Sequence, residues 1–273
     1  MHMEAAPGQE PFLVVRNGPV AHVTFNRPDK RNALSWPMVR RLAEILADLE
    51  SDAEMEIVVL AGEGQHFCAG GDLGSYIDLI QRPDDYRSYL LDFRRLVDGI
   101  EASPLIHVAV VRGYCVAGGL EILLACDLSI AGESARFSDG HLNFGQIPGG
   151  GSSQRLPRTI GIRRAKEMIL TGRFVPAPEA ERIGLINRCV ADEQLDDAAG
   201  ELLASIIGKS FTGRSEAKYL VNTGLAGPIG DGLSLEIDHC ARYETGHPDA
   251  LEGLLAFRDK RDPRFSPRRK QAK

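Results

Sequence analysis

The chain has 273 residues, of which 43% are hydrophobic and 26% are charged, and its formal net charge is −6. This composition is typical of a globular protein and disfavours a disordered chain, a nucleic-acid binder and a protein that docks on a membrane surface. Because no apolar run reaches the ~18 residues of a membrane helix and residues 1–11 lack the features of a signal peptide, we expect a cytoplasmic protein.

The first 150 residues alternate between strand and helix patterns. Residues 12–25 hold two runs rich in β-branched side chains, and the sequence Asn17-Gly18-Pro19 between them predicts a hairpin. An apolar stripe at spacings of three and four predicts a helix over 36–49. Further strands and helices are expected over 57–61, 84–100, 105–111 and 117–125. Such alternation favours an α/β sheet whose functional loops lie at the ends of strands.

Beyond residue 151 helical patterns dominate and strand patterns become sparse. We expect helices over 163–170, 178–183, 194–207, 215–221, 233–243 and 249–260. The predicted organisation is a core over 12–200 and a helical region over 201–265. Residues 1–11 and 266–273 are expected to be flexible.

The cysteines and histidines give no sign of a disulfide framework or a metal site. The chain has five cysteines, an odd number, without any C-x-x-C pair, and we therefore expect reduced thiols. The histidines show no spacing typical of metal ligands. No metal is predicted.

Three loops that contain glycine follow apolar strands or begin helices, over 62–72, 113–121 and 144–151. Glycine permits a positive φ and lets a ligand touch the backbone, so that amide N–H groups can converge on one anionic oxygen. An arrangement of this kind is an oxyanion hole. The alternative for each loop is that it forms only a tight turn.

Glu121 is the most informative single residue. It stands in the first turn of a segment, 118–125, that is apolar on every side and is therefore expected to be buried. Burial raises the pKa of a carboxyl group towards neutrality, where it can both accept and donate a proton. The alternative is a glutamate that only caps the helix or interacts with its dipole.

His141 precedes the third glycine loop, and an imidazole titrates near neutral pH. It could share proton transfer with Glu121, and Asp139 could orient it or simply form a turn. A histidine in a loop can also be structural. Cys68 is interpreted as a packing residue, and Ser152 lies outside any G-x-S-x-G motif, which disfavours a serine hydrolase.

Four motifs in this order resemble the enoyl-CoA hydratase/isomerase, or crotonase, superfamily. They are NRPDKRNAL at 26–34, HFCAGGDL at 66–73, GYCVAGGLE at 113–121 and FGQIPGGG at 144–151. Residues 252–261 also fit, and the similarity extends over 12–265.

The resemblance implies an α/β fold of the crotonase-like (ClpP/crotonase) type, which is a spiral of ββα units with a helical C-terminal trimerisation region. It also implies a homotrimer or a dimer of trimers that acts on an acyl-CoA thioester in fatty acid metabolism. Coenzyme A would be part of the substrate, with no separate cofactor and with no nucleic-acid or membrane partner.

The resemblance also implies roles for individual residues. The backbone N–H groups of Gly71 and Gly118 would form the oxyanion hole, and Glu121 and His141 would be the catalytic pair. Positions that match residues binding CoA in the family are Lys30, Arg31, Ala33, Ala69, Asp72 and Leu73, with Phe257 and Lys260 reaching the CoA of a neighbouring subunit.

Two departures from the family pattern bear on the activity. Hydratases of the family use two glutamates; Glu121 matches the first, whereas His141 stands at the position of the second. Gly74 and Ser75 stand where many hydratases carry a lysine that binds CoA.

The leading hypothesis is an enoyl-CoA hydratase, a lyase in which Glu121 activates water and His141 assists. Chemical alternatives are an isomerase and a hydrolase that cleaves a C–C bond of a 1,3-dicarbonyl acyl-CoA. Alternatives from other classes are a non-catalytic binding or scaffold protein and a serine peptidase on the same fold. Residues 76–89 and the C-terminal helices are expected to line the acyl pocket, although the sequence does not identify the acyl group.

Overall fold

The computed structural model describes residues 10–268, and its centre is a sheet of six strands in the order β1-β2-β3-β4-β6-β9. The first two strands form an antiparallel hairpin, and each later neighbour in the sheet is parallel. The strands are β1 (Phe12–Asn17), β2 (Val20–Phe25), β3 (Ile57–Gly62), β4 (Ile106–Val111), β6 (Leu128–Gly132) and β9 (Arg188–Val190).

A second, smaller sheet stands at one end of the first and consists of β5 (Tyr114–Val116), β7 (Arg136–Ser138) and β8 (Val175–Pro176). The helices up to β9 are α1 (Trp36–Ser51), α2 (Leu73–Ile80), α3 (Pro83–Ala102), α4 (Gly118–Ala125), α5 (Ser152–Ile160), α6 (Ile162–Thr171) and α7 (Ala177–Arg182). After β9 come α8 (Leu195–Ile207), α9 (Phe211–Gly224), α10 (Ile229–Gly246) and α11 (Pro248–Arg258). Short 3-10 helices are η1 (Pro28–Lys30), η2 (His141–Phe144) and η3 (Asp192–Gln194).

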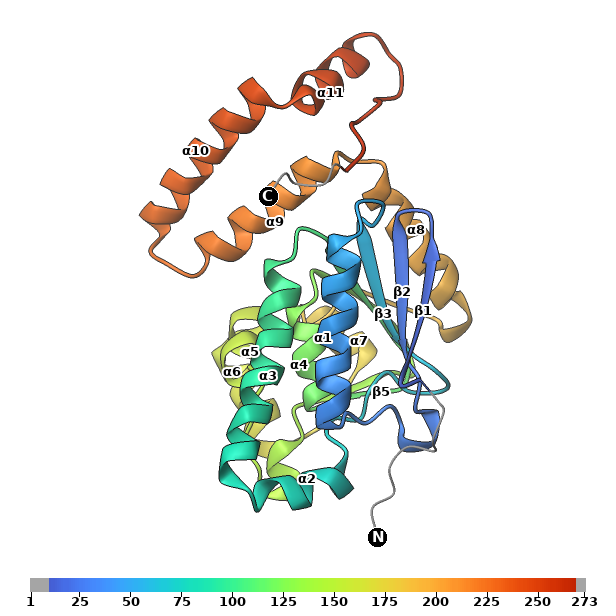
Figure 1. The fold of residues 1–273 in the computed structure, drawn as a ribbon, viewed down its shortest axis with the longest axis vertical. Coiled ribbons are helices and arrows are strands. Elements are labelled where there is room, and N and C mark those ends of the chain that lie inside the picture. Colours follow the sequence, from blue (N-terminus) through green and yellow to red (C-terminus); the bar gives the residue numbers. More distant parts are fainter. Residues whose placement is uncertain (1–9, 269–273) are drawn as a thin grey trace.

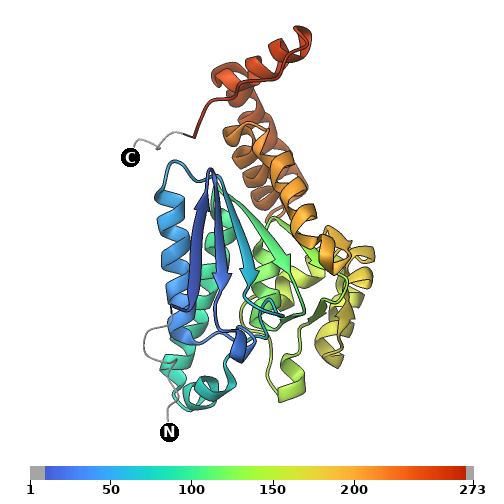
Figure 2. The ribbon, with the colours of Figure 1, turned by 90° about the vertical axis from the view of Figure 1, so that its right-hand side faces the viewer.

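The large sheet separates two apolar layers because alternate side chains of each strand point to opposite faces. One set, which includes Val23, Leu60 and Ala109, packs against α1, α3 and α4. The other set, which includes Val59 and Val108, packs against α8. Figures 1 and 2 show α1 and α3 on one side of the sheet and α8 on the other.

The longer elements were predictable because each is long enough to show a period. The hairpin, the strands over 57–61 and 105–111 and all the expected helices are confirmed. The helices α2 and α5 and the strands β5 to β9 were not anticipated. The strands β5, β7, β8 and β9 have only two or three residues and show no measurable alternation. Strand β6 has five residues, but four successive ones are buried, so it does not alternate either. Helix α2 follows a glycine loop directly.

Helices α9 to α11 form an arm that projects from the body, as Figure 1 shows. The expected boundary between residues 200 and 201 falls within α8, which packs on the sheet. Lys218 attaches α9 to the body: its ammonium donates to the carbonyl oxygens of Ile100 and Leu105 and to the carboxylate of Asp127, each at 2.9 Å.

Parts of both chain ends that were expected to be flexible contact the body. The Asn26 amide donates to the Glu10 carbonyl at 3.0 Å, and the Arg268 guanidinium donates to the Met55 carbonyl at 2.6 Å. Residues 1–9 and 269–273, the remainder of those termini, lie outside the described residues. Between residues 10 and 268, no helix combines the length and the apolarity that crossing a membrane requires.

Candidate active site

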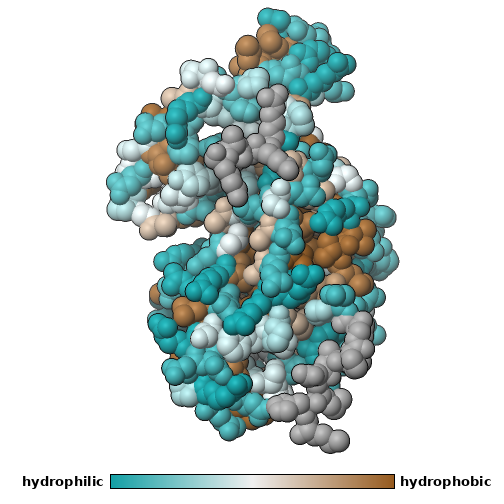
Figure 3. Space-filling model, viewed as in Figure 1, coloured by the Kyte–Doolittle hydropathy of each residue, from teal (hydrophilic) through white to brown (hydrophobic). Residues whose placement is uncertain are grey.

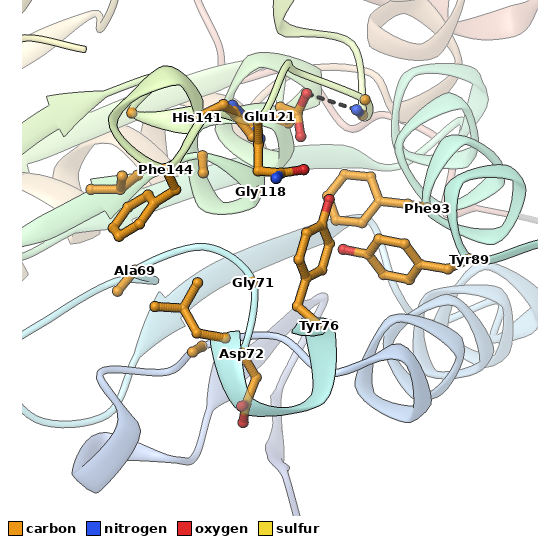
Figure 4. A pocket seen from close by; sticks show the side chains of 18 of the residues that line it. Ala69, Gly71, Asp72, Tyr76, Tyr89, Phe93, Gly118, Glu121, His141 and Phe144 are labelled. Carbon is orange, nitrogen blue, oxygen red and sulfur yellow. Dashed lines mark hydrogen bonds between the residues drawn. The ribbon is translucent and has the colours of Figure 1, made fainter. Parts of the chain in front are cut away.

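A cavity of about 470 Å³ lies at one end of the body, between the loops that follow β3, β5 and β7. It brings together segments that are far apart in the sequence, and Figure 4 shows that the labelled residues surround one space. Ten of the twelve predicted site residues line this cavity: Lys30, Arg31, Ala33, Ala69, Gly71, Asp72, Leu73, Gly118, Glu121 and His141. The motif residues therefore form one site.

The first amide of the expected oxyanion hole belongs to Gly71. Leu34 pairs with Gly71 in a parallel bridge, in which the Leu34 N–H donates to Gly70 O and the Asp72 N–H donates to Leu34 O, both at 2.8 Å. In such a bridge the N–H of Gly71 itself points away from Leu34. The N–H of Gly71 is therefore not used in this bridge, and Gly71 itself lines the cavity.

The second amide belongs to Gly118, the first residue of α4, whose N–H has no acceptor within the helix. Ala117 precedes it with φ 48° and ψ −117°, a backbone conformation that residues other than glycine rarely adopt. Both this strained residue and Gly118 line the cavity. The positive end of the helix dipole adds to its attraction for an anionic oxygen.

The two amides come from segments that lie side by side. Cys68 pairs with Cys115 in a parallel bridge, with the Cys68 N–H donating to Tyr114 O and the Val116 N–H donating to Cys68 O. A Cβ on Gly70 would lie 2.9 Å from the Ala117 Cβ and 3.8 Å from the Gly118 nitrogen. Glycine at position 70 is thus required for this close approach, and both oxyanion amides stand at the same end of the paired segments.

Glu121 is 2% exposed and projects from the first turn of α4. Its Oε1 accepts from the Gly150 N–H at 2.7 Å and the Ser152 N–H at 3.1 Å, the first of which is drawn in Figure 4. Burial raises the pKa of this carboxyl group, and the charge of His141 and the two amides offset part of the rise. In the third glycine loop, the N–H of Gly150 is therefore used to hold Glu121.

His141 stands at the start of η2 and lies beside Glu121 in Figure 4. Its Nδ1 lies 3.1 Å from Oδ1 of Asp139, whose carboxylate is fully buried. Burial lowers the pKa of His141, but the hydrogen bond to Asp139 and the charges of Glu121 and Asp139 outweigh it, so that the pKa is raised. Asp139 was expected either to orient His141 or to form a turn. Its contact with the His141 ring is that of an orienting group.

An aromatic wall closes the cavity on the side of α2 and α3. Tyr76, Tyr89, Leu90 and Phe93 line it, and the Tyr76 and Tyr86 hydroxyl groups lie 2.7 Å apart. A Cβ on Gly71 would lie 3.8 Å from the Tyr76 ring, so the wall begins directly beside the first oxyanion amide. The expectation that residues 76–89 line a pocket is confirmed for Tyr76 and Tyr89, and Leu90 and Phe93 extend the wall further along α3. The C-terminal helices, which were also expected to line it, contribute no residue to this cavity within the described chain.

The cationic rim of the cavity is the loop that contains Lys30, Arg31 and Ala33. Two buried contacts fix it: the Arg27 guanidinium donates to Ala33 O at 2.9 Å, and the Asn32 side chain donates to His66 O at 2.7 Å. These contacts keep two exposed positive charges beside the oxyanion loop.

The side chains of three residues that were expected to bind CoA do not point into this cavity. The Asp72 carboxylate accepts from Arg27 at 2.8 Å and caps α2, and Figure 4 shows it pointing away from the cavity centre. Phe257 is 87% exposed in α11, and Lys260 follows that helix. Both lie at the opposite end of the molecule from α2, so neither lines the cavity of its own chain.

The residues that sequence analysis missed act mainly through the backbone. Gly150 and Ser152 hold Glu121 through N–H groups, which any residue type carries, so the sequence had no signal for them. Over residues 10–268 no group of three or more metal-ligating side chains occurs.

Comparison with known proteins gives one consistent result. The sequence profile named enoyl-CoA hydratase/isomerase matches residues 15–268. A Bacillus subtilis protein assigned to the enoyl-CoA hydratases/isomerases is 38% identical over 257 residues, covering 93% of this chain and 97% of its own. The human mitochondrial enoyl-CoA hydratase domain-containing protein 2 is 34% identical, covering 96% and 91%. The crystal structure of enoyl-CoA hydratase from Bacillus anthracis superposes with a TM-score of 0.88 at 33% identity, covering 94% and 99%.

Proposed function

The chain belongs to the enoyl-CoA hydratase/isomerase family, and we propose that it is an enoyl-CoA hydratase in which Glu121 and His141 transfer the protons. The observation that carries the assignment of residues is the buried Glu121 carboxyl group in the same cavity as the Gly71 and Gly118 amides. A thioester bound there places its carbonyl oxygen on the amides and its double bond near the acid–base group.

The reaction follows from this placement. Glu121, ionised, takes a proton from water, and the oxygen of that water adds to the β-carbon of the 2,3-enoyl thioester. The electron pair of the double bond moves onto the thioester oxygen, where the Gly71 and Gly118 N–H groups stabilise the enolate. His141, protonated, then donates a proton to the α-carbon. One oxyanion donor contributes about 2.7–4 kcal/mol to transition-state stabilisation.

Binding of the CoA moiety is assigned to the cationic rim. Lys30 and Arg31 are exposed on the loop before Leu34 and suit phosphate groups, while the backbone near Ala33, Ala69 and Leu73 suits the pantetheine chain. Asp72 supports the site by its contact with Arg27 and by capping α2.

The arm suggests that the enzyme is a homotrimer or a dimer of trimers. Its helices expose large apolar side chains: Tyr219, Val221, Leu225, Ile229, Leu233, Ile237, Leu251, Leu254 and Phe257. Figure 3 shows hydrophobic atoms on the arm surface. In such an assembly Phe257 and Lys260 would reach the CoA site of a neighbouring copy.

The direct test is an assay with crotonyl-CoA, a long-chain enoyl-CoA, a cinnamoyl-CoA and a cyclic dienoyl-CoA, with products identified by mass spectrometry. Hydration adds the mass of one water and leaves the thioester intact. Isomerisation leaves the mass unchanged, and hydrolysis of a C–C bond yields a new carboxylate. A product of either of the last two kinds, with no hydration of any substrate, contradicts the proposal.

Glu121→Gln tests the assignment of the base. We expect kcat to fall by ~10²–10⁴-fold, the usual contribution of a general acid–base group, because an amide cannot accept the water proton. Affinity for a saturated acyl-CoA is expected to stay within about threefold, since the oxyanion amides and the cationic rim are unchanged. Full hydratase activity in this variant would remove Glu121 from the mechanism.

A further inference from the structure

The buried side chain of Asp139 has only one of its two carboxylate oxygens paired. Its Oδ1 lies 3.1 Å from His141 Nδ1, and the side chain is 0% exposed. Its Oδ2 is buried and has no hydrogen-bond partner within the described part of the chain. An ionised carboxylate that is buried in this way is unfavourable unless a positive charge lies beside it. The imidazole of His141, which contacts this carboxylate, can carry the positive charge when it is protonated.

The backbone around the pair is fixed, so the contact does not depend on a mobile loop. Ser138 is the last residue of β7. Its hydroxyl donates to Gly172 O at 3.0 Å, and its backbone carbonyl accepts from the Ala117 N–H at 3.0 Å. Gly140 follows Asp139 with φ 64°, and a Cβ there would lie 3.0 Å from Val116. This tight turn directs Asp139 inwards and brings His141 back towards it.

The two charged groups that shift the pKa of His141 are both carboxylates. Glu121 faces it from α4 and Asp139 from its own loop, and both raise the pKa of the imidazole. Helix α6 also packs against η2, but its charged residues, Arg163, Arg164, Lys166 and Glu167, are all exposed to solvent. Lys30, Arg31 and Asp72 lie on other loops around the same cavity. The two buried carboxylates therefore dominate the surroundings of the ring.

The contact also decides which nitrogen can serve the reaction. With the Nδ1–H donated to Asp139, Nε2 is the ring nitrogen that remains for a substrate. A neutral ring of this tautomer has a lone pair on Nε2 and no proton to give. Proton donation to the α-carbon thus requires the imidazolium form, with both nitrogens protonated.

We propose that Asp139 is a positioning residue that fixes His141 with Nδ1–H towards its carboxylate and keeps the ring protonated, so that Nε2–H is the proton donor to the α-carbon. Only the last part of this inference, proton donation from Nε2–H to the α-carbon, rests on the proposed function. Protons balance over the cycle, because Glu121 gains one from water and His141 loses one to carbon. A transfer from Glu121 to His141 through solvent restores both groups.

The first experiment measures the pairing without any substrate. In the ligand-free protein with ¹⁵N-labelled histidine, His141 is titrated by NMR, with its signals assigned from His141→Gln. Asp139→Asn is expected to lower the pKa of His141 by at least about one unit, because a buried neighbouring charge is removed. The other histidines serve as internal controls, and Glu167→Gln, which removes an exposed carboxylate of α6, is expected to leave the pKa of His141 unchanged.

The second experiment asks whether Asp139 acts through His141. Asp139→Asn is expected to lower the kcat of hydration by ~10–100-fold, leave KM within about threefold and move the alkaline limb of the pH profile to lower pH. In the His141→Gln background the same change is expected to alter kcat by less than about twofold, since the group it acts on is already absent.

Two results would overturn the proposal. One is an unchanged His141 pKa in Asp139→Asn, and the other is an equal loss of kcat with and without His141, which marks a purely structural role. If the wild-type enzyme hydrates no enoyl-CoA, the proposed function fails while the NMR titration still decides whether Asp139 holds the imidazolium.

Discussion

Glu121 and His141, the proposed acid–base pair, each shift the pKa of the other, and burial shifts both. Burial favours the neutral form of both groups, whereas their opposite charges favour the ionised form of both. The fully buried Asp139 adds a second negative charge next to His141. The balance leaves the pKa values of both groups above their ordinary values, which suits a base and an acid that must act at the same pH.

These shifts predict a bell-shaped pH profile for kcat/KM. Activity requires Glu121 ionised, so it falls as the pH drops through the raised pKa of Glu121. It also requires His141 protonated, so it falls as the pH rises through the raised pKa of His141. The alkaline limb is expected to disappear in His141→Gln. A limb that persists in that variant would assign it to another group.

Gly150 is predicted to tolerate no side chain. A Cβ there would lie 2.4 Å from the Phe93 ring and 2.5 Å from Glu121 Oε2. Gly150→Ala is therefore expected to displace Glu121, lowering kcat by about tenfold or more and the free energy of unfolding by about 1–3 kcal/mol. Gly99→Ala on α3 is the control, because nothing lies within 4 Å of its Cβ position. Equal behaviour of the two variants in chemical denaturation and in turnover would contradict this account.

At the scale of elements, the site depends on where parallel segments end. The strand-like pairing of Cys68 with Cys115 brings two glycine loops together, and β7, which is followed by Asp139, pairs with β5. The sequence marked these loops by their glycines, and it marked Glu121 by its apolar surroundings. It held no signal for the role of the third loop, which acts through the N–H groups of Gly150 and Ser152. The contact of Asp139 with His141 likewise depends on a turn of the backbone at Gly140 that residue types alone did not determine.

A buried cation contributes to the attachment of α9, beside the contacts of Arg214 with Glu56, of Ser215 with Pro104 O and of Asn222 with Glu101 O. Lys218 is 6% exposed in its side chain and pairs with Asp127, whose pKa is raised by burial and lowered in part by Lys218. Lys218→Ala is expected to lower the free energy of unfolding by about 3–5 kcal/mol, because it leaves a buried carboxylate without its counter-ion. Since the pKa of Asp127 rises further in the variant, the loss grows as the pH rises through that value.

The Lys218 prediction has a matched control. Lys218→Met combined with Asp127→Asn removes both charges and is expected to recover most of the lost stability in urea unfolding. Equal stability of Lys218→Ala and the wild type from pH 5 to pH 8 would show that the ion pair does not hold the arm.

At the scale of the whole molecule, a body that contains a nearly complete site carries an arm with little buried surface. The body supplies the proposed oxyanion amides, the proposed acid–base pair and the aromatic wall. The arm exposes nine large apolar side chains over α9 to α11 and holds Phe257 and Lys260 far from the cavity of its own chain. Exposed apolar surface is typical of interaction sites, which supports the proposed assembly.

Light scattering after size-exclusion chromatography tests the assembly. We expect the mass of three or six chains for the wild type. Ile237→Asp is expected to shift the mass towards smaller species, because it places a charge at an apolar position of α10 that is 69% exposed in the single chain. Glu236→Gln, its exposed neighbour, is expected to keep the wild-type mass. A monomeric wild type would contradict the proposed assembly.

A crystal structure of the complex with butyryl-CoA, a saturated substrate analogue, would show where the thioester binds. We expect the thioester oxygen at about 2.7–3.2 Å from the backbone nitrogens of both Gly71 and Gly118, with the β-carbon of the acyl chain facing Glu121. A thioester oxygen bound away from either amide, or an acyl chain directed away from Glu121, would contradict it.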